Sequence, residues 1–186
     1  MYLKEYEVPH SIKKHIEIKT NLFGEKYVTD LRPSAGKSAA KSGNLFEEFC
    51  YGIMIETLQI GKQFVKKKPK FICHYGLDRQ GDFEIISGER QIHIECKQLG
   101  NIESHFDKLS HVFMNLVSGC YGKEMWLVCD WNEELGNRGN KYINALLIRG
   151  QELKKEVALQ GITFELVSAK DLKKFIHKSI HTVLDY

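Results

Sequence analysis

Two acidic residues and a lysine lie at strand-like spacing in the middle of the chain. Asp82 opens the alternating segment 82–86, and Glu95 and Lys97 end the alternating segment 91–97. Side chains two residues apart in a strand share a face, so Glu95 and Lys97 point the same way. Carboxylates suit a hard divalent cation, and magnesium uses one or two of them while keeping several waters. These residue types predict a magnesium site with a lysine beside it.

A tight turn between the two segments would bring the carboxylates together. Gly88-Glu89 suits a two-residue hairpin turn of type II′, because glycine readily adopts the positive φ needed at the first central position. Counting outward from this turn pairs Asp82 with Glu95, whose Cβ atoms would lie about 5 Å apart. Like charges at that distance destabilise a sheet. The register therefore predicts a cation between the two acids.

The same register divides the hairpin into two faces. One face is fully apolar, as a buried sheet surface requires, and the other collects charged residues. The apolar face consists of Phe83, Ile85, Ile92 and Ile94, and the polar face consists of Asp82, Glu84, His93, Glu95 and Lys97. A competing interpretation is that the polar face is only the solvent side of a hairpin, with Lys97 pairing with one acid.

Helix and strand patterns alternate around this hairpin. Apolar residues at helical spacing predict amphipathic helices over 44–59 and 105–117, with Gly61 and Gly119 just beyond their ends. Further strands are expected over 70–75, 125–130, 143–148 and 162–167, a loop over 131–141, and further helices over 151–160 and 169–184. This order predicts a mixed α/β domain around one sheet.

The first 42 residues show no sustained period. They end in a run of small residues over 33–42, which predicts an irregular loop. We therefore expect an N-terminal arm over 1–42 and the main domain over 43–186. Within the small-residue run, Gly-Lys-Ser at 36–38 looks like the end of a phosphate-binding loop, but Leu31 stands where that motif needs a glycine. An ATPase is not expected.

Composition is ordinary for a water-soluble protein. The hydrophobic share is 42%, no window reaches the apolar length of a membrane span, and the N-terminus lacks the apolar segment of a secretory signal. We expect a cytoplasmic protein without a membrane partner. The five scattered cysteines include no C-x-x-C pair, which favours reduced thiols over structural zinc.

The net charge of +3 is too small to indicate nucleic-acid binding by itself. Basic residues do cluster at 66–70, and Arg32 lies near Lys37 and Lys41 in the sequence. Each cluster is explained equally well as a solvated loop.

Asp82, Glu95 and Lys97 together resemble the motif of the PD-(D/E)XK nuclease superfamily, an acid on one strand followed by acid-x-lysine on the next. Gly81 stands where the motif has proline, a departure that many members share. The expected order of elements over 43–130 is similar to the superfamily's α-β-β-β-α-β core. The resemblance implies a restriction-endonuclease-like fold, with a mixed central sheet flanked by helices.

The resemblance also implies a role for each residue. Asp82, Glu95 and the backbone carbonyl of Cys96 would bind Mg²⁺, which would stabilise charge on the attacked phosphate and lower the pKa of a bound water. Lys97 would orient or activate that water. The expected products carry a 5′-phosphate and a 3′-hydroxyl.

Two further groups of polar residues belong to the expected helices. Members of the superfamily often add a glutamate from the preceding helix in a context like Gly-x-x-Phe-Glu, which implies Glu47 as a catalytic residue, with Glu48 as the alternative. An acid in a first helical turn is also favoured by the helix dipole. On the next helix, His105, Lys108 and His111 lie one turn apart and could contact DNA, although such residues usually form only a helix's solvent side.

The resemblance implies a magnesium-dependent endonuclease that acts on double-stranded DNA. The catalytic core takes up most of the 186 residues and leaves no recognisable helix-turn-helix or zinc finger to read base sequence. In this the chain resembles the small catalytic subunit of heterodimeric type IIS restriction endonucleases, which cuts one strand while a larger subunit recognises the DNA. A Holliday-junction resolvase, a repair nuclease of the same superfamily and a non-catalytic DNA-binding module are the alternatives.

Overall fold

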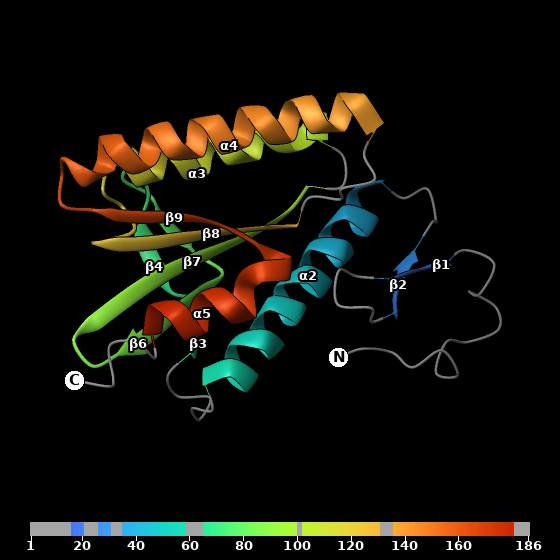
Figure 1. The fold of residues 1–186 in the computed structure, drawn as a ribbon, viewed down its shortest axis with the longest axis horizontal. Helices are drawn as coiled ribbons and strands as arrows, with labels where there is room; N and C mark the ends of the chain where they lie inside the picture. Colours follow the sequence, from blue (N-terminus) through green and yellow to red (C-terminus); the bar gives the residue numbers. More distant parts are fainter. Residues whose placement is uncertain are drawn as a thin grey trace.

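The computed structural model describes the backbone of residues 16–20, 26–30, 35–58, 65–99, 102–130 and 136–180, and within these the side chains of 44–58, 65–99, 109–130 and 142–180. At its centre lies a five-stranded mixed sheet with helices on both faces (Figure 1). The expected α/β class with a mixed sheet flanked by helices is confirmed.

The central sheet has the strand order β3-β6-β7-β8-β9. Its members are β3 (Val65–Lys67), β6 (Phe83–Ser87), β7 (Arg90–Gln98), β8 (Glu124–Asp130) and β9 (Thr163–Ser168). The pairs β3-β6 and β6-β7 are antiparallel, whereas β7-β8 and β8-β9 are parallel. Each parallel step has a helix in its connection, because parallel neighbours require a long crossover.

Each face of the sheet carries a hydrophobic core and a pair of helices (Figure 1). One core lies under α2 (Ala35–Leu58) and α5 (Leu172–Ile180), and the other lies under α3 (Ile102–Val117) and α4 (Gly136–Ala158). Strand β8 contributes to both cores, with Trp126 and Val128 on the α2 side and Met125 and Leu127 on the α3 side. This double burial is typical of a parallel strand and explains the continuous apolar run.

The predicted hairpin register is confirmed along β6 and β7, where Phe83 pairs with Ile94. The turn begins at Gly88, whose φ is +59°. Asp82 lies in a bend just before β6, however, so the ladder ends before the expected direct pair with Glu95. The four residues of the predicted apolar face are all at most 1% exposed: Phe83, Ile85, Ile92 and Ile94.

The first strand of the sheet differs from the expectation. A strand was expected over 70–75, but the edge position belongs to β3, and the next strand β4 (Lys70–Ile72) pairs instead with β5 (Asp78–Gln80) in a separate sheet. The chain is interrupted between β3 and β4 because Lys68 has a φ of +53° and Pro69 lacks an N–H for a ladder.

The expected strand over 143–148 is wrong, because these residues lie within helix α4. The same helix includes 136–141 of the expected loop, while 131–135 lie outside the described residues. Ile143 and Leu146 are buried, whereas Leu147 and Ile148 are exposed. This three-to-four-residue alternation continues through the buried Leu153 and Val157, and a six-residue window was too short to reveal it.

The ends of the chain also differ from the expected boundaries. Residues 35–42, expected to be irregular, form the first two turns of α2, and the segment before them contains β1 (Ile16–Thr20) paired with β2 (Lys26–Asp30). At the other end, a 3-10 turn (Ala169–Asp171) precedes α5, and the rest of the expected helix, 181–184, lies outside the described residues. None of the helices in the described part of the chain has the length and apolarity that a membrane span needs.

Candidate active site

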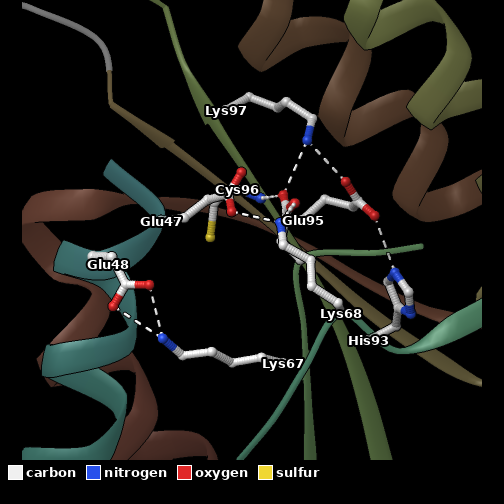
Figure 2. Close-up of polar contacts among 9 residues, drawn as sticks. Glu47, Glu48, Lys67, Lys68, His93, Glu95, Cys96 and Lys97 are labelled. Carbon is white, nitrogen blue, oxygen red and sulfur yellow. Dashed lines mark hydrogen bonds and ion pairs between the residues drawn. The ribbon is translucent and has the colours of Figure 1, made fainter. Parts of the chain in front are cut away.

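Asp82, Glu95 and Lys97 come together where the hairpin opens away from its turn. The Lys97 ammonium donates to Asp82 Oδ2 at 3.0 Å and to Glu95 Oε2 at 2.8 Å. The backbone N–H of Cys96 donates to Asp82 Oδ2 at 2.8 Å. One ammonium thus contacts both acids, and Lys97 supplies a positive charge between them (Figure 2).

The polar face of the hairpin is buried, so its interpretation as a simple solvent face is wrong. Asp82 and Glu84 are each 7% exposed, Glu95 is 6% exposed and His93 is 5% exposed. Buried carboxylates are stable only when they are paired or hydrogen-bonded, and these have such partners. The Lys97 side chain is 22% exposed, which makes it the most accessible member of the cluster.

Burial and ion pairing act in opposite directions on the charges of this cluster. Burial alone would lower the pKa of Lys97, but Glu95 and Asp82 outweigh it and raise that pKa above its ordinary value. Burial alone would raise the pKa of Asp82, but Lys97, the Cys96 N–H and Lys68 lower it. Both groups are therefore charged at neutral pH. Lys97 in this state can orient a water molecule or hold an anion, but it cannot accept a proton.

A second lysine connects helix α2 with the cluster. Lys68 Nζ donates to Glu47 Oε2 at 2.6 Å and lies 3.4 Å from Asp82 Oδ1. Burial raises the pKa of Glu47, the hydrogen bond from Lys68 opposes this rise, and the charge of Asp82 adds to it. Glu48 instead pairs with Lys67 at 2.8 Å and is more exposed (Figure 2). The structure therefore brings Glu47 towards Asp82 and directs Glu48 elsewhere.

The lysine run at 66–70 supplies counter-charges to neighbouring acids. Lys66 lies opposite Glu84 across the β3-β6 ladder and pairs with it at 3.2 Å. Lys67 pairs with a glutamate of α2 and lies 3.8 Å from the centroid of the Tyr51 ring. Lys68 was not predicted as a member of the site, because the lysine run was explained equally well as a solvated loop.

Lys68 occupies its position in a left-handed backbone conformation. Within the described backbone, Lys68 is the only non-glycine residue with a positive φ, which is +53°. Such a conformation costs an ordinary L-residue about 1–2 kcal/mol. The backbone N–H of Lys68 donates to the Asp82 carbonyl at 3.0 Å, so main chain and side chain both tie Lys68 to Asp82.

His93 contacts the carboxylate oxygen of Glu95 that Lys97 does not bind (Figure 2). Its Nε2 is 3.1 Å from Glu95 Oε1, and its ring stacks on Tyr121 with centroids 4.4 Å apart. The ring of Phe71 lies roughly perpendicular to the imidazole, with the two ring centroids 5.3 Å apart. The strand alternation had placed His93 on the polar face, but no residue pattern marked it as a site residue.

The remaining predicted site residues lie farther from the trio. Cys96 contacts Asp82 through its backbone N–H, while its thiol lies in the core, where burial raises its pKa. The exposed ring of His111 lies 6.1 Å from that of His74, beside the β4-β5 hairpin. The side chains of His105 and Lys108 lie outside those described.

The carboxylates of Asp82 and Glu95 contact the same ammonium, and the Cys96 carbonyl lies nearby in the chain; oxygen groups of these types are the ligands that a hard cation accepts. Comparisons of the chain with protein-family profiles, curated proteins and solved structures found no match. Within the described residues, no three His, Cys, Asp or Glu side chains form a group that could hold a metal. The predicted magnesium site would use two carboxylates, a backbone carbonyl and water, so it would not contain three such side chains.

Proposed function

We propose that this chain is a magnesium-dependent DNA endonuclease. The observation that carries the proposal is the convergence of Asp82, Glu95 and Lys97, in which one ammonium lies 3.0 Å and 2.8 Å from two buried carboxylates. The pKa of Asp82 is lowered and that of Lys97 is raised, and ionisable residues with shifted pKa values cluster at functional sites. Their residue types and their positions on the hairpin are those of the PD-(D/E)XK motif.

The order of elements supports the same proposal. Helix α2, strands β3, β6 and β7, helix α3 and strand β8 follow one another in the α-β-β-β-α-β order of that superfamily, with the β4-β5 hairpin inserted after the first strand. Asp82 precedes the second core strand, and Glu95 and Lys97 lie on the third. We infer from this that the fold is restriction-endonuclease-like.

The mechanism follows from what each side chain can do. Mg²⁺ bound by Asp82, Glu95 and the Cys96 carbonyl would stabilise phosphate charge and acidify a water. Lys97 remains a cation and orients the attacking water by hydrogen bonding. Glu47 and Asp82 both contact Lys68. The pKa of Glu47 is raised whereas that of Asp82 is lowered, so Glu47 is the better proton acceptor.

We propose that a larger subunit directs this chain to double-stranded DNA, so that the chain cuts one strand of a recognised site. Helices α2 to α5 each contribute buried residues to a core on the central sheet, and the described part of the chain contains no separate domain for reading DNA sequence. The lysines of β3 are paired with acids of the chain itself and add little to a DNA-binding surface.

Plasmid nicking in Mg²⁺, with and without a larger partner encoded beside this chain, tests the proposal. We expect Asp82→Asn to abolish nicking and Glu47→Gln to reduce it at least tenfold. Glu48→Gln is the matched control, because it changes the adjacent, exposed glutamate, and it should stay within twofold of the wild type.

Four outcomes would point elsewhere. Full nicking by Asp82→Asn would show that the site is wrong. Efficient cutting of plain duplex by the isolated chain would contradict dependence on a larger subunit, and a preference for four-way junctions would favour a resolvase. Binding to DNA without any cleavage in the presence of the partner would favour a non-catalytic module.

A further inference from the structure

We propose that His93 is a positioning residue that orients Glu95 for cation binding, and that residue 81 is glycine because the imidazole of His93 needs its space. The inference rests on the proposed function, since it deepens the description of the same site. His93 is not part of the motif that led to the site, and Gly81 stands where that motif has proline.

The contacts of His93 hold Glu95 in one orientation. His93 Nε2 lies 3.1 Å from Glu95 Oε1, while Lys97 binds the other carboxylate oxygen at 2.8 Å. Two donors on opposite oxygens fix the plane of the carboxylate. Partners of this kind commonly orient the ligands of a metal ion, and their loss costs about 10–100-fold in metal affinity. A proton on Nε2 suffices for the donation, so His93 can act as a neutral side chain.

The imidazole itself has little freedom to move. His93 is 5% exposed. Its ring is stacked on Tyr121 with an interplanar angle of 29° and lies at 78° to the ring of Phe71. Tyr121 is in turn hydrogen-bonded to Asn115 at 3.2 Å. The ring therefore stays where its Nε2 reaches Glu95.

Residue 81 is in contact with this ring. A Cβ added to Gly81 would lie 2.3 Å from His93 Cε1, 2.4 Å from His93 Nε2 and 3.2 Å from Glu95 Oε1. Gly81 is not among the glycines with positive φ, so space rather than backbone conformation demands glycine here. Its N–H also donates to the Pro69 carbonyl at 2.9 Å, a bond that proline could not make. The departure from the proline of the family motif thus has a local cause.

The first test measures Mn²⁺ binding by electron paramagnetic resonance, with urea unfolding as a check on the fold. We expect His93→Leu, which keeps the volume but removes the donor, to weaken Mn²⁺ binding about 10–100-fold. His93→Gln keeps a donor and should stay within about threefold of wild type. Wild-type affinity in His93→Leu would overturn the inference. If His93→Leu does not fold, a tenfold loss in His93→Gln would overturn it instead.

The second test needs no metal. Gly81→Ala should lower the melting temperature clearly in the wild type but add little in a His93→Ala background, where the ring is absent. Additive effects of the two substitutions would overturn the steric part of the inference.

The two proposals fail in different ways. If His93→Leu binds Mn²⁺ with wild-type affinity and Asp82→Asn no longer nicks DNA, the inference is wrong and the proposed function stands. If the wild-type chain neither binds Mn²⁺ nor nicks DNA with its partner, the function is wrong, and the role of His93 in cation binding is wrong with it.

Discussion

Lys97 is the residue on which the charge balance of the site depends. It contacts two buried carboxylates at once, and its ammonium lies where the hairpin register had led us to expect a cation. Without Lys97, Asp82 and Glu95 would face each other with Lys68 as the remaining cation near Asp82. Removing one partner of a buried ion pair leaves the other charge uncompensated, which is more costly than losing an exposed pair.

We therefore expect Lys97→Met to lower the free energy of unfolding by about 2 kcal/mol at pH 7 in cation-free buffer, a value reduced for the partial exposure of the lysine. The pKa of Asp82 is lowered in the folded state. Ionised Asp82 therefore contributes to the free energy of unfolding above its unfolded pKa of about 3.9, and this contribution is lost as the pH falls through the folded-state pKa. The difference between Lys97→Met and wild type should shrink accordingly at pH 3. Urea unfolding at both pH values measures it.

Lys67→Met is the control, because it removes a lysine that is 40% exposed and pairs with an exposed glutamate. An exposed pair contributes about 1 kcal/mol or less. Equal losses in the two variants at pH 7 would contradict the special position of Lys97.

At the residue scale, strand alternation and hairpin counting correctly predicted that Asp82, Glu95 and Lys97 lie together, because both are local operations. Glu47 was implied instead by the resemblance to the superfamily. The sequence patterns missed Lys68 and His93, whose roles depend on elements distant in the chain. Lys68 reaches Glu47 from the bend that follows β3, and the His93 ring is held by Phe71 and Tyr121. Neither relation is visible in any window of neighbouring residues.

Among the elements, those with local signals were predicted best. The β6-β7 hairpin follows from a glycine turn and period-two alternation, and α3 from its single apolar stripe. Strand β3 was missed because two of its three residues are lysines. In the structure these lysines pair with acids of α2 and β6, which the strand's own residues do not indicate. Helix α4 was partly mistaken for a strand because a short apolar run has no decisive period.

Two glycines within helices give a prediction at the same scale. Gly52 lies in α2, and a Cβ there would meet nothing within 4 Å, whereas a Cβ at Gly150 in α4 would lie 2.9 Å from Leu166 Cδ2. We expect Gly52→Ala to stabilise the protein by about 0.5–1 kcal/mol, because alanine is the better helix former. Gly150→Ala should stabilise the protein less, because the Leu166 side chain must move to make room for the new Cβ. Chemical denaturation compares the two, and a larger gain at Gly150 would contradict the packing of α4 on β9.

For the whole molecule, the proposed cation site predicts linkage between binding and folding. A ligand that binds only the folded chain stabilises it by about 2.7 kcal/mol at a concentration 100 times its dissociation constant. Mg²⁺ should therefore raise the melting temperature of wild type in a concentration-dependent way. Asp82→Asn should show no such rise, while Glu48→Gln should behave as wild type. An equal rise in all three would place the cation elsewhere on the molecule.

The left-handed backbone of Lys68 has a consequence for attempts to engineer this chain. Glycine adopts a φ of +53° without the cost that lysine incurs, and the ion pairs of Lys68 are weakened by the 48% exposure of its side chain. We expect Lys68→Gly to equal or exceed wild type in urea unfolding, by up to about 1 kcal/mol, but to nick DNA at least tenfold more slowly because Glu47 loses its link to Asp82. A loss of stability above 1 kcal/mol would contradict this. A library screened only for heat resistance would then discard this lysine and enrich for well-folded, inactive variants.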